Sequence, residues 1–146
     1  MKKHEITPAL EALKAVKVNK IGDDKFKKAL IADYVTLVKE KKNLEDEIAA
    51  IKTTHLSPFE KEQEEIAQLQ QELQTETERT KQVEIAREIN SHKDYFEAFR
   101  AFNKAVEELG KEEIHLGGLD QVKFIDEMDK QGFELGLIEA VFPMFN

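Results

Sequence analysis

The positions of glycine and proline constrain this chain more than any other feature of its sequence. Neither residue occurs in residues 23–57 or in residues 59–109. Proline breaks a helix and glycine weakens one, so such long intervals are typical of helices. Apolar side chains recur within both intervals at spacings of three and four residues, which match one face of a helix. The pattern predicts an all-α fold.

The first interval predicts a helix over residues 24–52 with two apolar stripes. The first stripe has the alternating spacing of a coiled-coil seam and comprises Leu30, Tyr34, Leu37, Lys41, Leu44, Ile48 and Ile51. Ile31, Val35 and Val38 form a second stripe beside it. Two adjacent stripes are wider than a two-stranded coil requires. We therefore expect the N-terminal half of this helix to be buried in a core of several helices.

The second interval predicts a further helix over residues 58–90. The residues Ser-Pro-Phe-Glu at 57–60 form a capping box with proline in the first turn. We expect this helix to fold back on residues 24–52, which gives a long antiparallel, coiled-coil-like hairpin. The apolar stripe changes register near Asn90, so a break there is favoured over one continuous helix across residues 58–109.

Single residues indicate where other helices begin and end. Asp23 or Asp24 can cap the helix that follows, because an aspartate side chain accepts hydrogen bonds from free backbone N–H groups. Asp120 can cap a short helix that Gly132 would close. Gly110 is expected at the first position beyond a helix that ends near Leu109.

An aromatic stripe follows the expected break. Tyr95, Phe99, Phe102 and Val106 recur at helical spacing and predict a smaller helical body within residues 91–146. The last 14 residues carry eight large apolar side chains, whereas a disordered terminus is polar. This apolar tail either closes the aromatic body or inserts into a neighbouring subunit or a partner.

These patterns divide the chain into three parts. Residues 1–22 form an N-terminal helix and linker, residues 23–90 the hairpin, and residues 91–146 the C-terminal body with its tail. Helix–helix contacts with a second copy or a partner are expected at apolar positions of the hairpin and the tail. These positions are Leu37, Leu44, Ile48, Leu69, Leu73, Phe133, Leu137, Phe142, Met144 and Phe145.

Charge is unevenly distributed along a chain whose net charge is −8. Residues 1–56 hold 12 basic and 9 acidic side chains, whereas residues 57–90 hold 4 and 9 and residues 91–146 hold 6 and 12. A local basic cluster comprises Lys14, Lys17, Lys20, Lys25, Lys27 and Lys28. It is either a solvated face complementary to the acidic segments or a phosphate-binding patch. No arginine or aromatic platform accompanies the lysines, so nucleic-acid binding is the weaker interpretation.

No residue pattern indicates catalysis, a cofactor or a metal. The two serines, Ser57 and Ser91, both lie where a helix cap is expected. Glu112 and His115 have the E-x-x-H spacing of di-iron bundles, but a second such motif is missing. The four histidines are too scattered for a zinc cluster. We therefore predict that the protein is not an enzyme and has no cofactor.

Composition also bears on localisation. Cysteine is absent, which disfavours a disulfide-stapled secreted domain. No apolar run approaches the roughly 20 residues that span a bilayer, and the first residues lack the apolar core of a signal peptide. We expect a soluble, cytoplasmic protein without a membrane partner.

The N-terminal part of the chain has a recognisable resemblance. The segments Leu-Glu-Ala-Leu-Lys at 10–14, Lys-Ile-Gly-Asp-Asp at 20–24 and residues 28–37 resemble the N-terminal part of small helical proteins encoded by phages and prophages. The resemblance covers about 30 residues and implies a phage-type assembly or accessory role. With the helical pattern, it favours a non-enzymatic protein–protein interaction or assembly protein that forms homo-oligomers. The alternative is a nucleic-acid-associated accessory factor that uses the lysine cluster.

Overall fold

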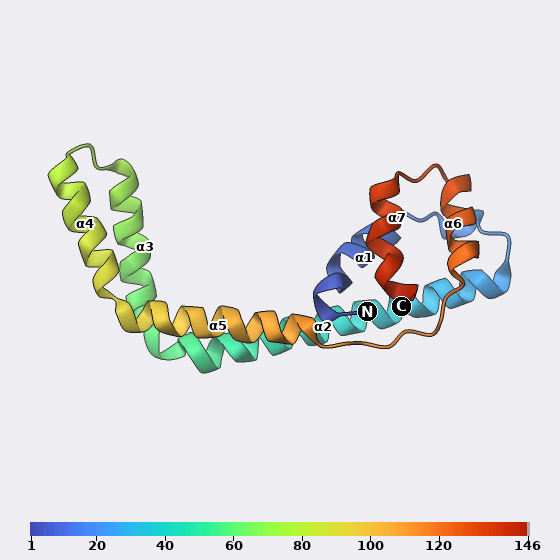
Figure 1. The fold of residues 1–146 in the computed structure, drawn as a ribbon, viewed down its shortest axis with the longest axis horizontal. Helices are drawn as coiled ribbons and strands as arrows, with labels where there is room; N and C mark the ends of the chain where they lie inside the picture. The colour runs from blue at the N-terminus through green and yellow to red at the C-terminus, as the bar shows by residue number, and fades with distance from the viewer. Residues whose placement is uncertain (146) are drawn as a thin grey trace. The chain divides into compact units, whose positions relative to one another are not determined.

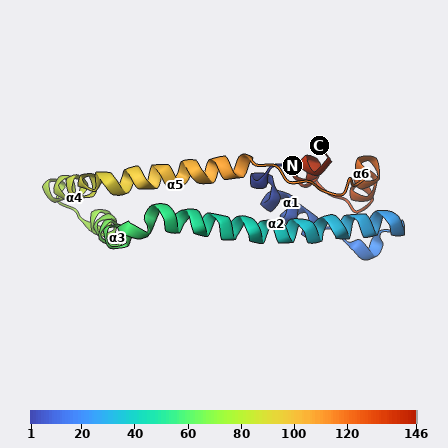
Figure 2. The ribbon, with the colours of Figure 1, turned by 90° about the horizontal axis from the view of Figure 1, so that it is seen from below.

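The computed structural model describes residues 1–145, and it is all-α, as the sequence predicts (Figure 1). The α-helices are α1 (Ile6–Lys14), α2 (Asp24–Leu56), α3 (Glu60–Thr75), α4 (Arg79–Ser91), α5 (Lys93–Lys111), α6 (Gln121–Lys130) and α7 (Leu135–Val141). Short 3-10 helices cover Lys3–Glu5, Val18–Lys20, Ser57–Phe59 and Phe142–Phe145. Figure 2 shows α2 as one uninterrupted helix.

The chain forms two compact units. Unit 1 comprises Met1–Glu47 and the chain from Glu108 onward, and unit 2 comprises Ile48–Glu107. This division differs from the expected segments 1–22, 23–90 and 91–146. The reason is that the two ends of the chain pack together in unit 1. No local sequence pattern predicts a contact between residues so far apart in the chain.

The core of unit 1 is built on α1 and α7, which lie side by side (Figure 1). Ile6 and Leu10 of α1 are fully buried, as are Phe124 of α6 and Val141 of α7. The small side chain of Ala9, also fully buried, allows a neighbouring helix to approach α1 closely. The spacing of these residues in α1 places them on one face, and that face is the buried one.

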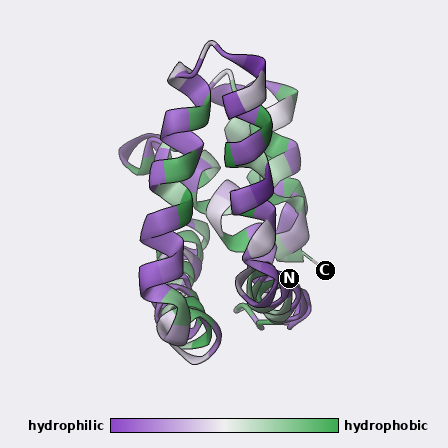
Figure 3. Cartoon of the chain, turned by 90° about the vertical axis from the view of Figure 1, so that its left-hand side faces the viewer, coloured by the Kyte–Doolittle hydropathy of each residue, from purple (hydrophilic) through white to green (hydrophobic). Residues whose placement is uncertain are grey.

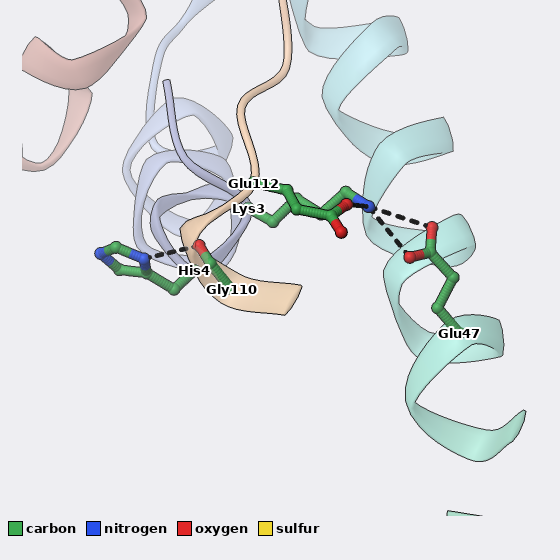
Figure 4. Close-up of polar contacts among 5 residues, drawn as sticks. All are labelled: Lys3, His4, Glu47, Gly110 and Glu112. Atoms are coloured by element: carbon green, nitrogen blue, oxygen red, sulfur yellow. Dashed lines mark hydrogen bonds and ion pairs between the residues drawn. The ribbon is translucent and has the colours of Figure 1, made fainter. Parts of the chain in front are cut away.

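Hydrogen bonds and ion pairs hold the N-terminal residues against residues 110–114. The backbone N–H of Lys3 donates to the carbonyl of Glu112 at 2.9 Å. The Lys3 ammonium contacts Glu112 at 2.7 Å and Glu47 at 2.9 Å (Figure 4). Its hydrogen bond to Glu112, followed by the one to Glu47, raises the pKa of Lys3 above its ordinary value.

Gly110 has a different role from the one expected. It lies inside α5 and does not end it, and its carbonyl is 2.8 Å from Nδ1 of His4 (Figure 4). A Cβ atom at Gly110 would meet the Cβ of His4 at 3.2 Å. This glycine therefore allows the N-terminal segment to approach the helix.

The predicted ends of α6 are confirmed. Asp120 accepts a hydrogen bond from the backbone N–H of Lys123 at 3.0 Å. Gly132 follows the helix with a φ of 75°, and its N–H donates to the carbonyl of Asp129. The N–H of Phe133 donates to the carbonyl of Met128, which completes a Schellman motif. Asp23 similarly caps α2, because its side chain accepts from the N–H of Phe26.

Unit 2 contains a helical hairpin, but its arms are α3 and α4 (Figures 1 and 3). The single helix predicted over residues 58–90 is therefore wrong. The chain turns at residues 76–78, where the Glu76 side chain accepts hydrogen bonds from the N–H groups of Thr77 and Glu78. The side chain of Gln82 donates to the carbonyl of Glu76 at 2.7 Å. These local bonds replace the helical ones and end α3.

The boundary between α2 and α3 also differs from the prediction. α2 continues through Leu56, and Ser57–Phe59 forms a 3-10 turn before α3 begins at Glu60. No side-chain hydrogen bond caps either start, so the capping box at residues 57–60 is not formed. The break predicted near Asn90 is confirmed, because α4 ends at Ser91 and α5 begins at Lys93.

The apolar tail packs within the chain, although not on the aromatic stripe. Ile138, Val141 and Met144 are buried in the core of unit 1. Tyr95 belongs to the core of unit 2 and stacks on Phe99 with ring centroids 6.1 Å apart. The expected closure of the aromatic body by the tail is therefore wrong, because the buried face of α7 is complementary to α1.

Candidate interaction surface

A groove in unit 1 lies between α1, the 3-10 turn that follows it and the N-terminal half of α2. Its volume is about 190 Å³, and apolar side chains provide most of its surface. The lining residues are Leu13, Lys14, Val16, Val18, Leu30, Ile31 and Tyr34. The groove forms because α1 ends at Lys14 and the chain makes a loop and a 3-10 turn before α2 begins.

The second stripe of α2 extends this groove along the helix. Ile31, Val35 and Val38 are 42%, 45% and 45% exposed, whereas Leu30 and Leu37 of the first stripe are almost fully buried. The sequence predicts burial of both stripes, but unit 1 covers only one. Three neighbouring apolar side chains thus remain in contact with water on one helix face.

Lysines surround this apolar surface. Lys27 and Lys28 precede Ile31 by four and three residues, and Lys39 and Lys42 follow Val35 and Val38 by four, so all four lie beside the stripe on α2. We call the groove, the stripe and these flanking lysines the lysine-rimmed groove.

Most lysines of the basic cluster form no ion pair within the described residues. Lys14 contacts Glu11 at 2.8 Å, and this hydrogen bond raises the pKa of Lys14 and lowers that of Glu11. The other cluster members form no ion pair with any of residues 1–145, namely Lys17, Lys20, Lys25, Lys27 and Lys28. The surface is therefore apolar at its centre and positive at its rim.

The interaction residues expected from the sequence do not form one surface. Leu37 is buried and Leu44 partly buried in the core of unit 1. Leu69 and Leu73 pack against the core of unit 2, and Ile48 of the same unit is half-buried. Leu37 and Leu44 thus contribute to one core, and Leu69 and Leu73 contribute to the other.

The tail residues are divided in the same way. Met144 is buried, and Phe133 and Phe145 pack against the core of unit 1. Leu137 and Phe142 are 37% and 38% exposed. Only these last two are available to a partner to a substantial degree.

The candidate metal pattern is not assembled in the structure. Glu112 and His115 lie in the extended segment that follows α5, where the spacing i, i+3 does not place two side chains on one face. Among residues 1–145, no three His, Cys, Asp or Glu side chains are grouped closely enough to hold a metal ion. None of the helices in this part of the chain is long and apolar enough to cross a membrane.

Comparison of the chain with protein-family models, curated proteins and solved structures finds no match. The candidate function therefore depends on the surface itself. The sequence contained one signal for it, the second stripe of α2, which was expected to be buried. Its exposure became evident only from the packing of α1, α6 and α7 on the other side of the helix.

Proposed function

We propose that the protein is a non-enzymatic interaction or assembly protein, and that the lysine-rimmed groove binds an acidic amphipathic helix. The observation that carries the proposal is the exposure of Ile31, Val35 and Val38. Beside them, Lys27, Lys28 and Lys39 form no ion pair with any of residues 1–145, whereas Lys42 contacts Asp46 at 3.8 Å. An amphipathic helix enters such a groove with apolar anchors one turn apart. Acidic side chains beside its anchors would then neutralise the rim.

The size of the groove supports a protein partner over a small ligand. About 190 Å³ is below the roughly 300–1,000 Å³ of typical small-molecule pockets. It fits individual anchoring side chains, and the exposed stripe continues the contact along α2. The resemblance of the N-terminal segments to small phage-encoded helical proteins agrees with a phage-type assembly role.

The alternative is the nucleic-acid-associated factor that the lysine cluster suggests. Single-stranded nucleic acids are bound by aromatic side chains that stack on bases within a basic groove. Among the residues that line this groove, Tyr34 is the one aromatic residue, and aliphatic side chains form the centre of the surface. The chemistry of the centre therefore favours a protein helix.

Fluorescence anisotropy with three labelled probes tests the proposal. The probes are an amphipathic peptide with glutamates beside its apolar face, the same peptide with lysines instead, and a single-stranded oligonucleotide. We expect the acidic peptide to bind most tightly. The double variant Val35→Asn/Val38→Asn should weaken this binding at least about tenfold, or about 1.4 kcal/mol.

Val83→Asn is the matched control, because Val83 is a valine of similar exposure, 44%, on α4 of unit 2. It should leave binding of the acidic peptide unchanged. Equal binding of the acidic and basic peptides would contradict the proposal. Preferential binding of the oligonucleotide, insensitive to the two asparagines, would support the nucleic-acid alternative instead.

A further inference from the structure

Unit 1 carries a second exposed surface whose character is opposite to that of the lysine-rimmed groove. Val122 and Ile125 of α6 are 69% and 37% exposed and lie on one side of the helix. Asp129, seven residues after Val122, falls on the same side of α6. Asp126, four residues after Val122, lies beside Val122 on the helix surface. The exposed side of α6 thus combines apolar and acidic side chains.

Helix α7 repeats this combination. Leu135 is 76% exposed, and Phe142, the residue that follows α7, is 38% exposed. Phe142 still has helical backbone angles and comes seven residues after Leu135, so both fall on the same side. Glu139 lies between them on that side. We call the exposed residues Val122, Ile125, Asp126 and Asp129 of α6, together with Leu135, Glu139 and Phe142, the acidic face.

The charges of the two surfaces are complementary. Residues 14–28 contain six lysines and two aspartates, whereas residues 120–139 contain six acidic residues and two lysines. Two ion pairs involve the minority charges: Lys123 contacts Asp23 of the other segment at 2.8 Å, and Lys130 contacts Glu127 of its own segment at 3.6 Å. Within the two surfaces themselves, the residues that form no ion pair with any of residues 1–145 are Lys27, Lys28 and Lys39 at the groove and Asp126, Asp129 and Glu139 at the acidic face. The unpaired charge is therefore positive at the groove and negative at the acidic face.

We infer that the lysine-rimmed groove receives the acidic face of a second copy of this chain. Both surfaces are exposed in one and the same unit, so neither covers the other within a copy. A second copy supplies the apolar side chains and the negative charge that the groove requires. This inference rests on the proposed function, because it names the partner of the same groove.

The contact must join different surfaces of the two copies. A contact between two grooves would place lysines opposite lysines. A contact between two acidic faces would place carboxylates opposite carboxylates, and like charges repel in both cases. A contact between unlike surfaces leaves one free groove and one free acidic face, so further copies add to a chain or close a ring. The protein thereby assembles beyond a dimer.

Sedimentation velocity on two complementary double variants tests this assembly. Variant A, Val35→Asn/Val38→Asn, lacks the groove stripe and retains the acidic face. Variant B, Val122→Asn/Leu135→Asn, lacks the two most exposed apolar side chains of the acidic face and retains the groove. We expect the average sedimentation coefficient of the wild type to increase with protein concentration between about 1 μM and about 1 mM. Each variant alone should remain monomeric over the same range.

An equimolar mixture of A and B should form a 1:1 dimer and stop there, since only one intact contact can form. Val83→Asn is the control and should assemble like the wild type. Circular dichroism checks that variants A and B are folded. We expect both to fold, because all four substituted side chains are exposed. The charge-swapped pair Lys27→Glu/Lys28→Glu and Asp126→Lys/Asp129→Lys provides a second test, because each alone should be monomeric and the two should associate.

Three results would overturn the inference in distinguishable ways. A wild type that stays monomeric while the groove still binds the acidic peptide leaves the proposed function intact and excludes a second copy as the partner. A wild type that assembles while the mixture of A and B does not would place the contact elsewhere. If neither the peptide nor a second copy binds, both proposals fail.

Discussion

Asp33 is the buried polar residue with the most unusual surroundings. Its side chain is 4% exposed, and Oδ1 accepts a hydrogen bond from the N–H of Gly117 at 3.0 Å. Its other oxygen, Oδ2, is buried and has no hydrogen-bond partner among residues 1–145. This hydrogen bond connects the N-terminal half of α2 to the extended segment that leads to α6. Glycine suits position 117, because a Cβ there would lie 3.1 Å from Oδ1, closer than an ordinary van der Waals contact.

We expect Gly117→Ala to destabilise unit 1 by about 1–3 kcal/mol, the range for disturbing a buried hydrogen bond. Asp33→Ala should remove the same bond. The double variant should therefore cost less than the two single variants added together, because they share one interaction. Urea denaturation of the four proteins measures this. Strict additivity would show that the two residues act independently.

Asp23 should make stability depend on pH in the acidic range. Its hydrogen bond to Lys123, followed by that from the N–H of Phe26, lowers its pKa below the ordinary 3.8. A lowered folded-state pKa stabilises the protein above the ordinary value, and this contribution disappears as pH falls through the folded pKa. The unfolding free energy of the wild type should exceed that of Asp23→Asn at neutral pH.

This excess should shrink as the pH falls below 3.8. Denaturation at a series of pH values gives the difference directly. Lys123→Met is the companion variant and should show the same dependence, since it removes the partner charge. A difference that persists unchanged in strong acid would mean that the carboxylate charge is not responsible.

At the scale of the elements, α6 and α7 show how two glycines in neighbouring segments serve different purposes. Gly132 has a φ of 75° in the Schellman motif, a conformation that other residues adopt only with strain. Gly136 lies within α7, its φ is not positive, and a Cβ added there would meet nothing within 4 Å. The first glycine is required by its backbone, and the second weakens its helix.

Gly132→Ala should therefore destabilise the protein by about 1–2 kcal/mol. Gly136→Ala should stabilise it by about 0.5–1 kcal/mol, because alanine loses less backbone entropy in a helix. The two changes add the same methyl group within five residues, so each is the control for the other. Thermal unfolding followed by circular dichroism distinguishes them, and shifts of the same sign would refute the assignment.

At the scale of the whole molecule, the two units have cores of very different size. The core of unit 1 contains 18 buried residues, whereas that of unit 2 contains four. Fewer buried apolar contacts mean a lower free energy of local opening. The hairpin of α3 and α4 should therefore open more readily than the helices of unit 1.

Hydrogen exchange should show this difference. We expect amides of α3 and α4 to be protected at least about tenfold less than those of α1. Leu10→Ala, which costs about 2–5 kcal/mol, should lower protection in α1 and α7 and spare α3 and α4. Ile66→Ala should have the opposite pattern. If either substitution lowers protection equally everywhere, the chain unfolds as one unit.

The sequence by itself determined the features that depend on neighbouring residues. Intervals free of glycine and proline predict helices, and Asp120 with Gly132 predicts both ends of α6, because caps are local hydrogen bonds. The break near Asn90 was predicted from the change of apolar register there. The turn at Glu76 was missed, because a glutamate that accepts hydrogen bonds from the next two N–H groups resembles any other helical glutamate in sequence.

Only the tertiary structure decided which apolar faces are covered. A stripe such as Ile31, Val35 and Val38 has the same pattern whether it is buried or exposed, and burial depends on distant segments that pack on the other side of α2. The same holds for Gly110, whose missing side chain is explained only by His4, more than 100 residues away. Long-range packing therefore positions the candidate interaction surface, and local periodicity supplies the helices that carry it.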